Sequence, residues 1–176
     1  FESVGSDESI PDNNVTALTQ DATGFLWIGT PDGLIRYDGY RFRHFDHESA
    51  DSTSPGGDFV RSMLTARDGQ LWVGSNADGV SAIDPISGRI ERFRAGDGDR
   101  ALSNNSVRAL AEDRDGSVWI GTREGVDQWD PATGQMRHYR QRFGASTSID
   151  DEQIIALMVD SAGDVWIGSW GGLGVR

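Results

Sequence analysis

Four tryptophans recur along the chain at nearly constant spacing and in nearly the same local sequence. Trp27, Trp72, Trp119 and Trp166 are separated by 45, 47 and 47 residues. Their surroundings read LWIGT, LWVGS, VWIGT and VWIGS. Self-similarity at this period predicts a repeat protein, in which each unit completes its hydrophobic core against its neighbours.

One repeat predicts four short antiparallel strands. In the third copy, Asp115-Gly116 and Glu124-Gly125 are hairpin-turn signals, because glycine accepts a positive φ without steric cost. The segment DPATG forms a third turn, in which proline presets φ. The strands are then expected over residues 107–112, 118–122, 126–129 and 135–140.

The polarity of these strands predicts a β-propeller. The second strand is apolar on both faces, as in a covered sheet, whereas the fourth carries charges, as at a wet edge. We therefore expect an all-β fold of antiparallel four-stranded blades, about three and a half in number. The tryptophans should fill the gaps between blades, and the glycines that follow them should mark the close approach of a neighbouring backbone or ring. The expected blades span residues 15–45, 60–94, 107–140 and, incompletely, 154–176.

Composition excludes several classes of function. The formal net charge is −12, from 28 acidic and 16 basic residues, which argues against binding to nucleic acid or to an anionic membrane. The absence of cysteine excludes disulfides, thiolate metal sites and a cysteine nucleophile. No run of 18 apolar residues predicts a membrane-spanning helix.

The repeat resembles that of the two-component regulator propeller family. The resemblance rests on NNVTALTQDATGFLWIGTPDGLIRYDG at residues 13–39 and on NNSVRALAEDRDGSVWIGTREGVDQWDPATG at residues 104–134. It implies a periplasmic or extracellular sensor propeller, usually of seven blades, that precedes an immunoglobulin-like domain, a membrane helix and a histidine kinase or diguanylate cyclase. The second copy departs by one extra residue in SNADG, and the fourth stops within its third strand.

The residues favour a non-catalytic module without a cofactor or metal. The chain has no nucleophile elbow, dinucleotide-binding loop or complete calcium loop. His44, His47 and His138 are interpreted as surface residues, although a metal pair of the first two is conceivable. The carboxylates of the innermost strands fall next to the first turns, at Asp21, Glu112, Asp113 and Asp160. The alternatives are a propeller enzyme, such as a lyase or hydrolase, and a scaffold for protein contacts.

One end of the propeller is the expected binding face. Long polar loops, residues 46–59, 95–106 and 141–153, enter the innermost strands there, beside the turns between second and third strands. The ligand would be a small molecule, hydroxyl-rich or anionic, such as an oligosaccharide. Alternatively, the charged side chains pair with acids in adjacent loops, and the turn tryptophan packs on a neighbouring loop. The candidate ligand-binding residues are Asp32, Arg61, Asn76, Asp78, Arg108, Arg123, Glu124 and Trp170.

The ends of the chain yield two further expectations. Phe1 lies 14 residues before Val15, as Phe93 lies 14 before Val107, so Phe1 should end an outer strand. Three and a half blades should not close into a ring, which would leave apolar sheet faces uncovered. Self-association is expected to cover them, and the non-methionine start suggests a mature product or an excised piece.

Overall fold

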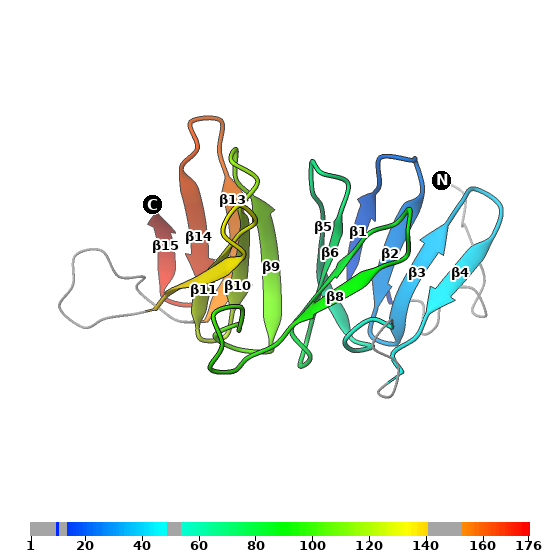
Figure 1. Ribbon diagram of the computed structural model, residues 1–176, viewed down its shortest axis with the longest axis horizontal. Helices are drawn as coiled ribbons and strands as arrows, with labels where there is room; N and C mark the ends of the chain where they lie inside the picture. Colours follow the sequence, from blue (N-terminus) through cyan, green and yellow to red (C-terminus); the bar gives the residue numbers. More distant parts are fainter. Residues whose placement is uncertain (1–9, 11–13, 49–53, 141–152) are drawn as a thin grey trace.

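The computed structural model describes residues 10, 14–48, 54–140 and 153–176, which form strands and loops but no helix. Within these residues, fifteen strands make four sheets, and each sheet is antiparallel with its strands in sequence order. The sheets stand side by side in one row, with the first and the last at opposite ends (Figure 1). The predicted all-β partial propeller is therefore confirmed, and the described part of the chain is not a closed ring.

The four blades have the following strands. The first blade contains β1 (Ala17–Gln20), β2 (Leu26–Thr30), β3 (Gly33–Tyr37) and β4 (Phe42–Phe45), and the second β5 (Val60–Thr65), β6 (Leu71–Ser75), β7 (Val80–Ile83) and β8 (Ile90–Phe93). The third contains β9 (Val107–Glu112), β10 (Val118–Thr122), β11 (Gly125–Asp130) and β12 (Gln135–Tyr139). The fourth has three strands, β13 (Ile154–Val159), β14 (Val165–Ser169) and β15 (Gly172–Val175).

The innermost strands β1, β5, β9 and β13 contact one another in turn, and a hydrophobic core fills each blade junction. Trp27 belongs to the core between the first two blades, Trp72 to the next and Trp119 to the last. Each ring also packs against an aromatic residue of its own outer strand, at centroid distances of 5.2, 5.4 and 5.3 Å. The predicted position between blades is confirmed for these three tryptophans, whereas Trp166 of the last blade belongs to none of the three cores.

In the first three blades, the glycine two residues after the tryptophan receives a side chain of the next blade, not the expected backbone or ring. A Cβ at Gly29 would lie 2.5 Å from Val60 Cγ1, and one at Gly121 would lie 2.6 Å from Ile154 Cγ2. The first residue of each inner strand therefore inserts over the glycine of the preceding blade. Val15, the equivalent residue of the first blade, is 42% exposed, and β1 begins at Ala17, two residues later than expected.

An aspartate at the end of the innermost strand holds the tryptophan in three blades. The indole Nε1 donates to Asp21 in the first blade at 2.8 Å, to Asp113 in the third at 3.1 Å and to Asp160 in the fourth at 2.9 Å. Burial alone would raise the pKa of Asp21, but hydrogen bonds from Thr23, Trp27 and backbone amides hold it below its usual value. The hydrogen bond from Trp166 chiefly lowers the pKa of Asp160.

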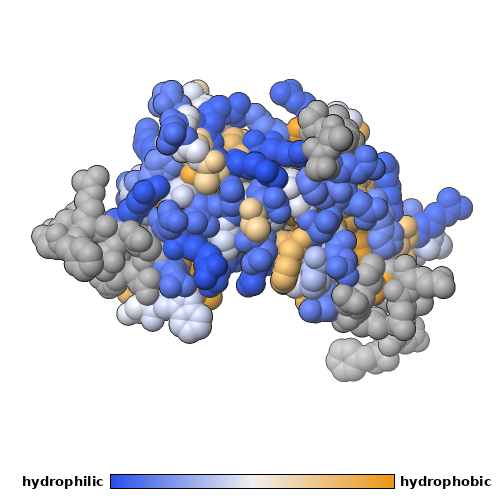
Figure 2. Space-filling model, turned by 90° about the horizontal axis from the view of Figure 1, so that it is seen from below, coloured by the Kyte–Doolittle hydropathy of each residue, from blue (hydrophilic) through white to orange (hydrophobic). Residues whose placement is uncertain are grey.

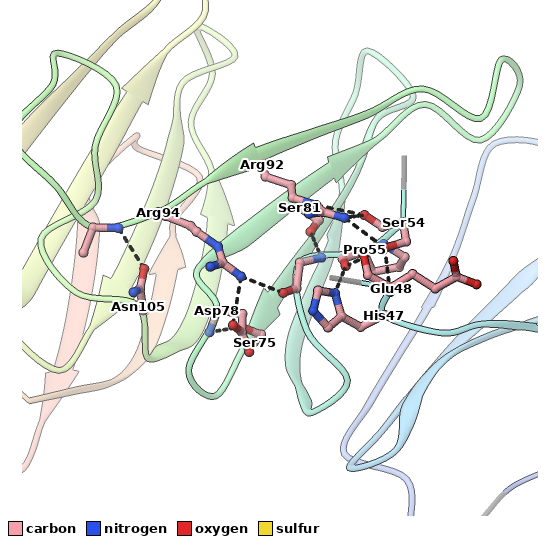
Figure 3. Close-up of polar contacts among 12 residues, drawn as sticks. His47, Glu48, Ser54, Pro55, Ser75, Asp78, Ser81, Arg92, Arg94 and Asn105 are labelled. Atoms are coloured by element: carbon pink, nitrogen blue, oxygen red, sulfur yellow. Dashed lines mark hydrogen bonds and ion pairs between the residues drawn. The ribbon is translucent and has the colours of Figure 1, made fainter. Parts of the chain in front are cut away.

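The linkers that enter a blade dock on its outer strands. Ser54 and Gly56 precede β5, and Arg92 of β8 donates to the Ser54 carbonyl while Ser81 of β7 accepts the Gly56 amide (Figure 3). In the third blade the equivalent position on β11 is Asp127, which is fully buried and accepts from the Ser103 amide and hydroxyl. These two linkers are thus fixed near the end of the blade that the sequence predicts to bind ligand.

The two end blades expose apolar side chains. Leu18 is 65% exposed on the first blade, and Met158 and Leu173 are 55% and 67% exposed on the fourth. At the junctions between blades, the equivalent surfaces are covered by the neighbouring blade. The predicted location of Phe1 lies outside the described residues.

Candidate ligand-binding face

The turns between second and third strands and the described linkers into the second and third blades lie at one end of the row, the lower end in Figure 1. Figure 2 shows this end from below, and most of its surface is hydrophilic with only isolated hydrophobic spots. A predominantly polar face suits a ligand recognised by hydrogen bonds and charge.

Two of the candidate arginines sit at β-bulges. The pairing of β5 with β6 passes from Val60 to Ser62 and omits Arg61, and the pairing of β9 with β10 passes from Val107 to Ala109 and omits Arg108. An extra residue of this kind bends the strand and redirects its side chain. The repeat thus places an unpaired residue on the innermost strand at the candidate face of both blades.

Arg61, Arg108 and Arg123 form a cluster of positive charge that no carboxylate neutralises in the described part of the chain. Burial lowers the pKa of Arg108, and repulsion from Arg61 and Arg123 lowers it further. The Arg108 Nε is buried and has no hydrogen-bond partner. A buried donor without a partner is costly, and an anion is the kind of group that would supply the missing acceptor.

Three other candidates make local contacts. Asn76 accepts from Arg61 Nε at 2.8 Å, and it thereby orients one member of the cluster. Asp78 accepts from Arg94 at 2.9 Å (Figure 3), and Glu124 accepts from Asn104 at 2.9 Å. Asp78 thus pairs with an arginine outside the cluster and Glu124 bonds to a neutral amide, so neither acid neutralises the cluster.

The remaining two candidates are exposed. The Asp32 amide donates to the Thr30 hydroxyl at 3.1 Å, and the residue makes a further interaction. Trp170 is 70% exposed, while its backbone amide bonds to Gln153 at 3.3 Å. The sequence analysis missed Phe59, whose ring stacks 5.1 Å below the Arg61 guanidinium, and Asn104. Both lie in linkers, where repeat alignment gives no signal.

The histidines lie away from this cluster. His47 Nδ1 contacts the Pro55 carbonyl at 2.8 Å, within the docked linker (Figure 3). His138 on β12 pairs with the buried Asp127 at 2.7 Å, and His44 is exposed on β4. Across residues 10, 14–48, 54–140 and 153–176, no group of three or more potential metal ligands occurs.

The family model for the two-component regulator propeller matches residues 9–32, 54–77, 101–124 and 148–171, which is more than half of the chain. Each match covers an inner strand, the repeat tryptophan and the following turn. The chain belongs to this family. The resemblance inferred from the repeat is thus confirmed.

Solved structures with the same fold include an extracellular domain of a signalling system and an enzyme. An extracellular domain assigned to a hybrid two-component system of Bacteroides thetaiotaomicron is 25% identical, with a TM-score of 0.88 over 99% of the chain and 24% of that domain. Virginiamycin B lyase from Staphylococcus aureus is 16% identical, with a TM-score of 0.70 over 94% of the chain and 53% of the lyase. At this identity the lyase shows only a shared fold.

A curated relative, histidine kinase P4 of Formosa agariphila, is 37% identical over 54 residues, which are 31% of the chain and 4% of the kinase. The chain thus spans a small part of the relatives it matches. In the segments that the structure describes, no helix is long and apolar enough to cross a membrane.

Proposed function

We propose that the chain is an extracytoplasmic, non-catalytic sensor segment of a membrane-bound signalling protein of the histidine kinase or diguanylate cyclase type. Membership of the regulator propeller family supports this proposal, as does the similarity to an extracellular domain of a hybrid two-component system. The ligand binds at the face that carries the arginine cluster. The periplasm or cell exterior is then its location.

The arginine cluster is the observation that carries the binding proposal. Three guanidinium groups lie near one another in a protein of net charge −12. Acidic residues are therefore abundant, yet among the described residues none forms an ion pair with these arginines. Such repulsion is tolerated where a ligand supplies the missing charge. A small molecule or oligosaccharide that bears a carboxylate or sulfate fits this site, with Asp32, Asn76, Asp78, Glu124 and Trp170 as surrounding contacts.

The test uses the full-length receptor with Arg108→Ala and Arg123→Ala, separately and together. A thermal-shift screen of neutral and acidic oligosaccharides identifies the ligand, and the dose–response of the receptor is then measured. We expect each substitution to weaken the response to an acidic ligand about 10-fold or more, since a charge-assisted hydrogen bond contributes about 1.5–3 kcal/mol. Arg137→Ala is the matched control, because Arg137 lies on β12 and pairs with Asp130. Unchanged curves in both cluster variants exclude this face.

The enzyme alternative has less support. The carboxylates Asp21, Asp113 and Asp160 are engaged by tryptophan indoles. His47 and His138 contact linker or neighbouring side chains, as described above. A general acid or base must have a side chain that is free to reach a bound substrate, and these side chains are already held by contacts within the protein.

The exposed apolar residues of the end blades support self-association as a further part of the proposal. Two arcs of this size together approximate a seven-bladed ring and cover both faces. Light scattering at increasing concentration is expected to show dimers or larger species. A strict monomer at high concentration contradicts self-association and leaves the ligand proposal intact.

A further inference from the structure

The second blade lacks the aspartate that holds the tryptophan in the other three. Ala66 occupies the position equivalent to Asp21, Asp113 and Asp160. Trp72 is only 3% exposed as a residue, but its indole nitrogen is not fully enclosed, and the N–H has no hydrogen-bond acceptor among the described residues. A buried indole normally finds such a partner, so this donor is an exception within the repeat.

A pocket opens where the carboxylate is missing. It has a volume of about 190 Å³ and lies between the second and third blades. Trp72, Phe93 and Trp129 line it with aromatic surface, and Phe93 contacts both tryptophan rings at centroid distances of 5.4 and 4.8 Å. The pocket is open to solvent and its exposed lining is more polar than apolar, but its volume is comparable to the roughly 150 Å³ of an enclosed apolar cavity that holds a benzene ring. The pocket therefore has room for one ring with a polar substituent.

The charged groups around the pocket restrict the charge of a ligand. Asp68 and Glu91 contribute to the lining, and these carboxylates repel an anion. A cation is also disfavoured, because the Arg100 guanidinium already lies over Phe93 and Trp129, at 5.2 and 4.9 Å, and pairs with Glu91. An uncharged ring avoids both conflicts and stacks on the aromatic walls.

We propose that this pocket is a second binding site, for an uncharged single-ring molecule whose oxygen accepts the Trp72 indole N–H. The ligand oxygen replaces the carboxylate that Asp21, Asp113 and Asp160 provide in the other blades. The lining residues Asp68 and Gly116 lie in the turns between first and second strands, at the opposite end of the blades from the arginine cluster. The site is therefore independent of the proposed sensor face.

Phenol is the probe, because it is uncharged at neutral pH and has one ring and one oxygen. The tryptophan indole N–H resonances of the ¹⁵N-labelled full chain are recorded during a titration, and Trp72→Phe assigns the Trp72 signal. We expect the Trp72 resonance to shift with half-saturation on the order of 1 mM, as is typical of so small a ligand. The Trp27 resonance, whose donor is bound to Asp21, should stay in place and serves as an internal reference.

Ala66→Asp is the decisive variant, since its carboxylate fills the position of the ligand oxygen. It is expected to weaken phenol binding at least 10-fold, whereas Ala66→Gly, which leaves the pocket open, is expected to bind as the wild type does. Toluene and benzoate test the required oxygen and the absence of charge, and both should bind more weakly than phenol. The proposal is overturned by a Trp72 resonance that phenol does not move, by equal binding to Ala66→Asp, or by tighter binding of toluene or benzoate.

Discussion

The turns between the first two strands of the second and third blades differ at two side chains, Ala66 against Asp113 and Gln70 against Ser117, and they share the same backbone hydrogen bond. The Ala66 amide donates to the Gln70 carbonyl at 2.8 Å, and the Asp113 amide donates to the Ser117 carbonyl at the same distance. The aspartate is therefore not needed to form this turn. Its role in the third blade is to satisfy the buried indole of the neighbouring strand.

The aromatic contact, by contrast, is common to the first three blades. Trp27 packs on Phe45, Trp72 on Phe93 and Trp119 on Tyr139. Apolar packing is therefore sufficient to form the blade. The hydrogen bond to the carboxylate adds to the stability of a blade but is not required for its fold. The second blade can thus lose the carboxylate and keep its fold.

The largest change in stability is expected when the first blade loses its aspartate and so resembles the second blade. Asp21→Ala removes the acceptor for the Trp27 indole, which is 1% exposed, and for backbone amides of the turn. We expect a loss of about 2–3 kcal/mol in the free energy of unfolding, measured by urea denaturation. Asp21→Asn retains an acceptor and should lose less. Equal stability of Asp21→Ala and wild type contradicts a structural role for this carboxylate.

The reverse substitution is expected to have a smaller effect of opposite sign. Ala66→Asp supplies an acceptor for Trp72 and should raise the free energy of unfolding by about 0.5–1.5 kcal/mol. The nearby Asp68 and Glu91 reduce this gain through repulsion. Ala66→Asn gives the same hydrogen bond without charge, so it separates the two contributions. A lower stability of both variants in the same denaturation experiment contradicts the equivalence of the four positions.

The sequence was sufficient to predict the blades, because glycine turns and strand polarity are local signals repeated in register. It also predicted Arg61 and Arg108 at one end of the inner strands. It could not show that both are bulged or that Arg108 has a buried donor, since these depend on contacts between strands. Alignment of the repeats does reveal Ala66 opposite three aspartates, but its consequence depends on Phe93 and Trp129 from two different blades.

The last prediction concerns pH and has the smallest effect. The pKa values of Asp21 and Asp160 are lowered in the folded chain, from an ordinary value of 3.8. Between the folded and unfolded pKa values the unfolded chain binds more protons, so acid favours unfolding. The stabilisation is fully present above the unfolded pKa and is lost as pH falls through the folded pKa. Urea denaturation of the wild type should therefore show a loss of stability that begins near pH 4 and continues below it.

Variants that remove or add an indole-bonded aspartate show how much of this pH dependence comes from these carboxylates. Asp38, Asp84 and Asp130 also have lowered pKa values, and they contribute the same background slope to every variant. Asp21→Asn and Asp160→Asn should each reduce the slope below pH 4, because each removes one carboxylate bonded to an indole. Ala66→Asp should steepen it, because it adds such a carboxylate in the one blade that lacks it. Identical slopes in all four proteins would mean that the indole bonds do not favour the ionised form of these aspartates.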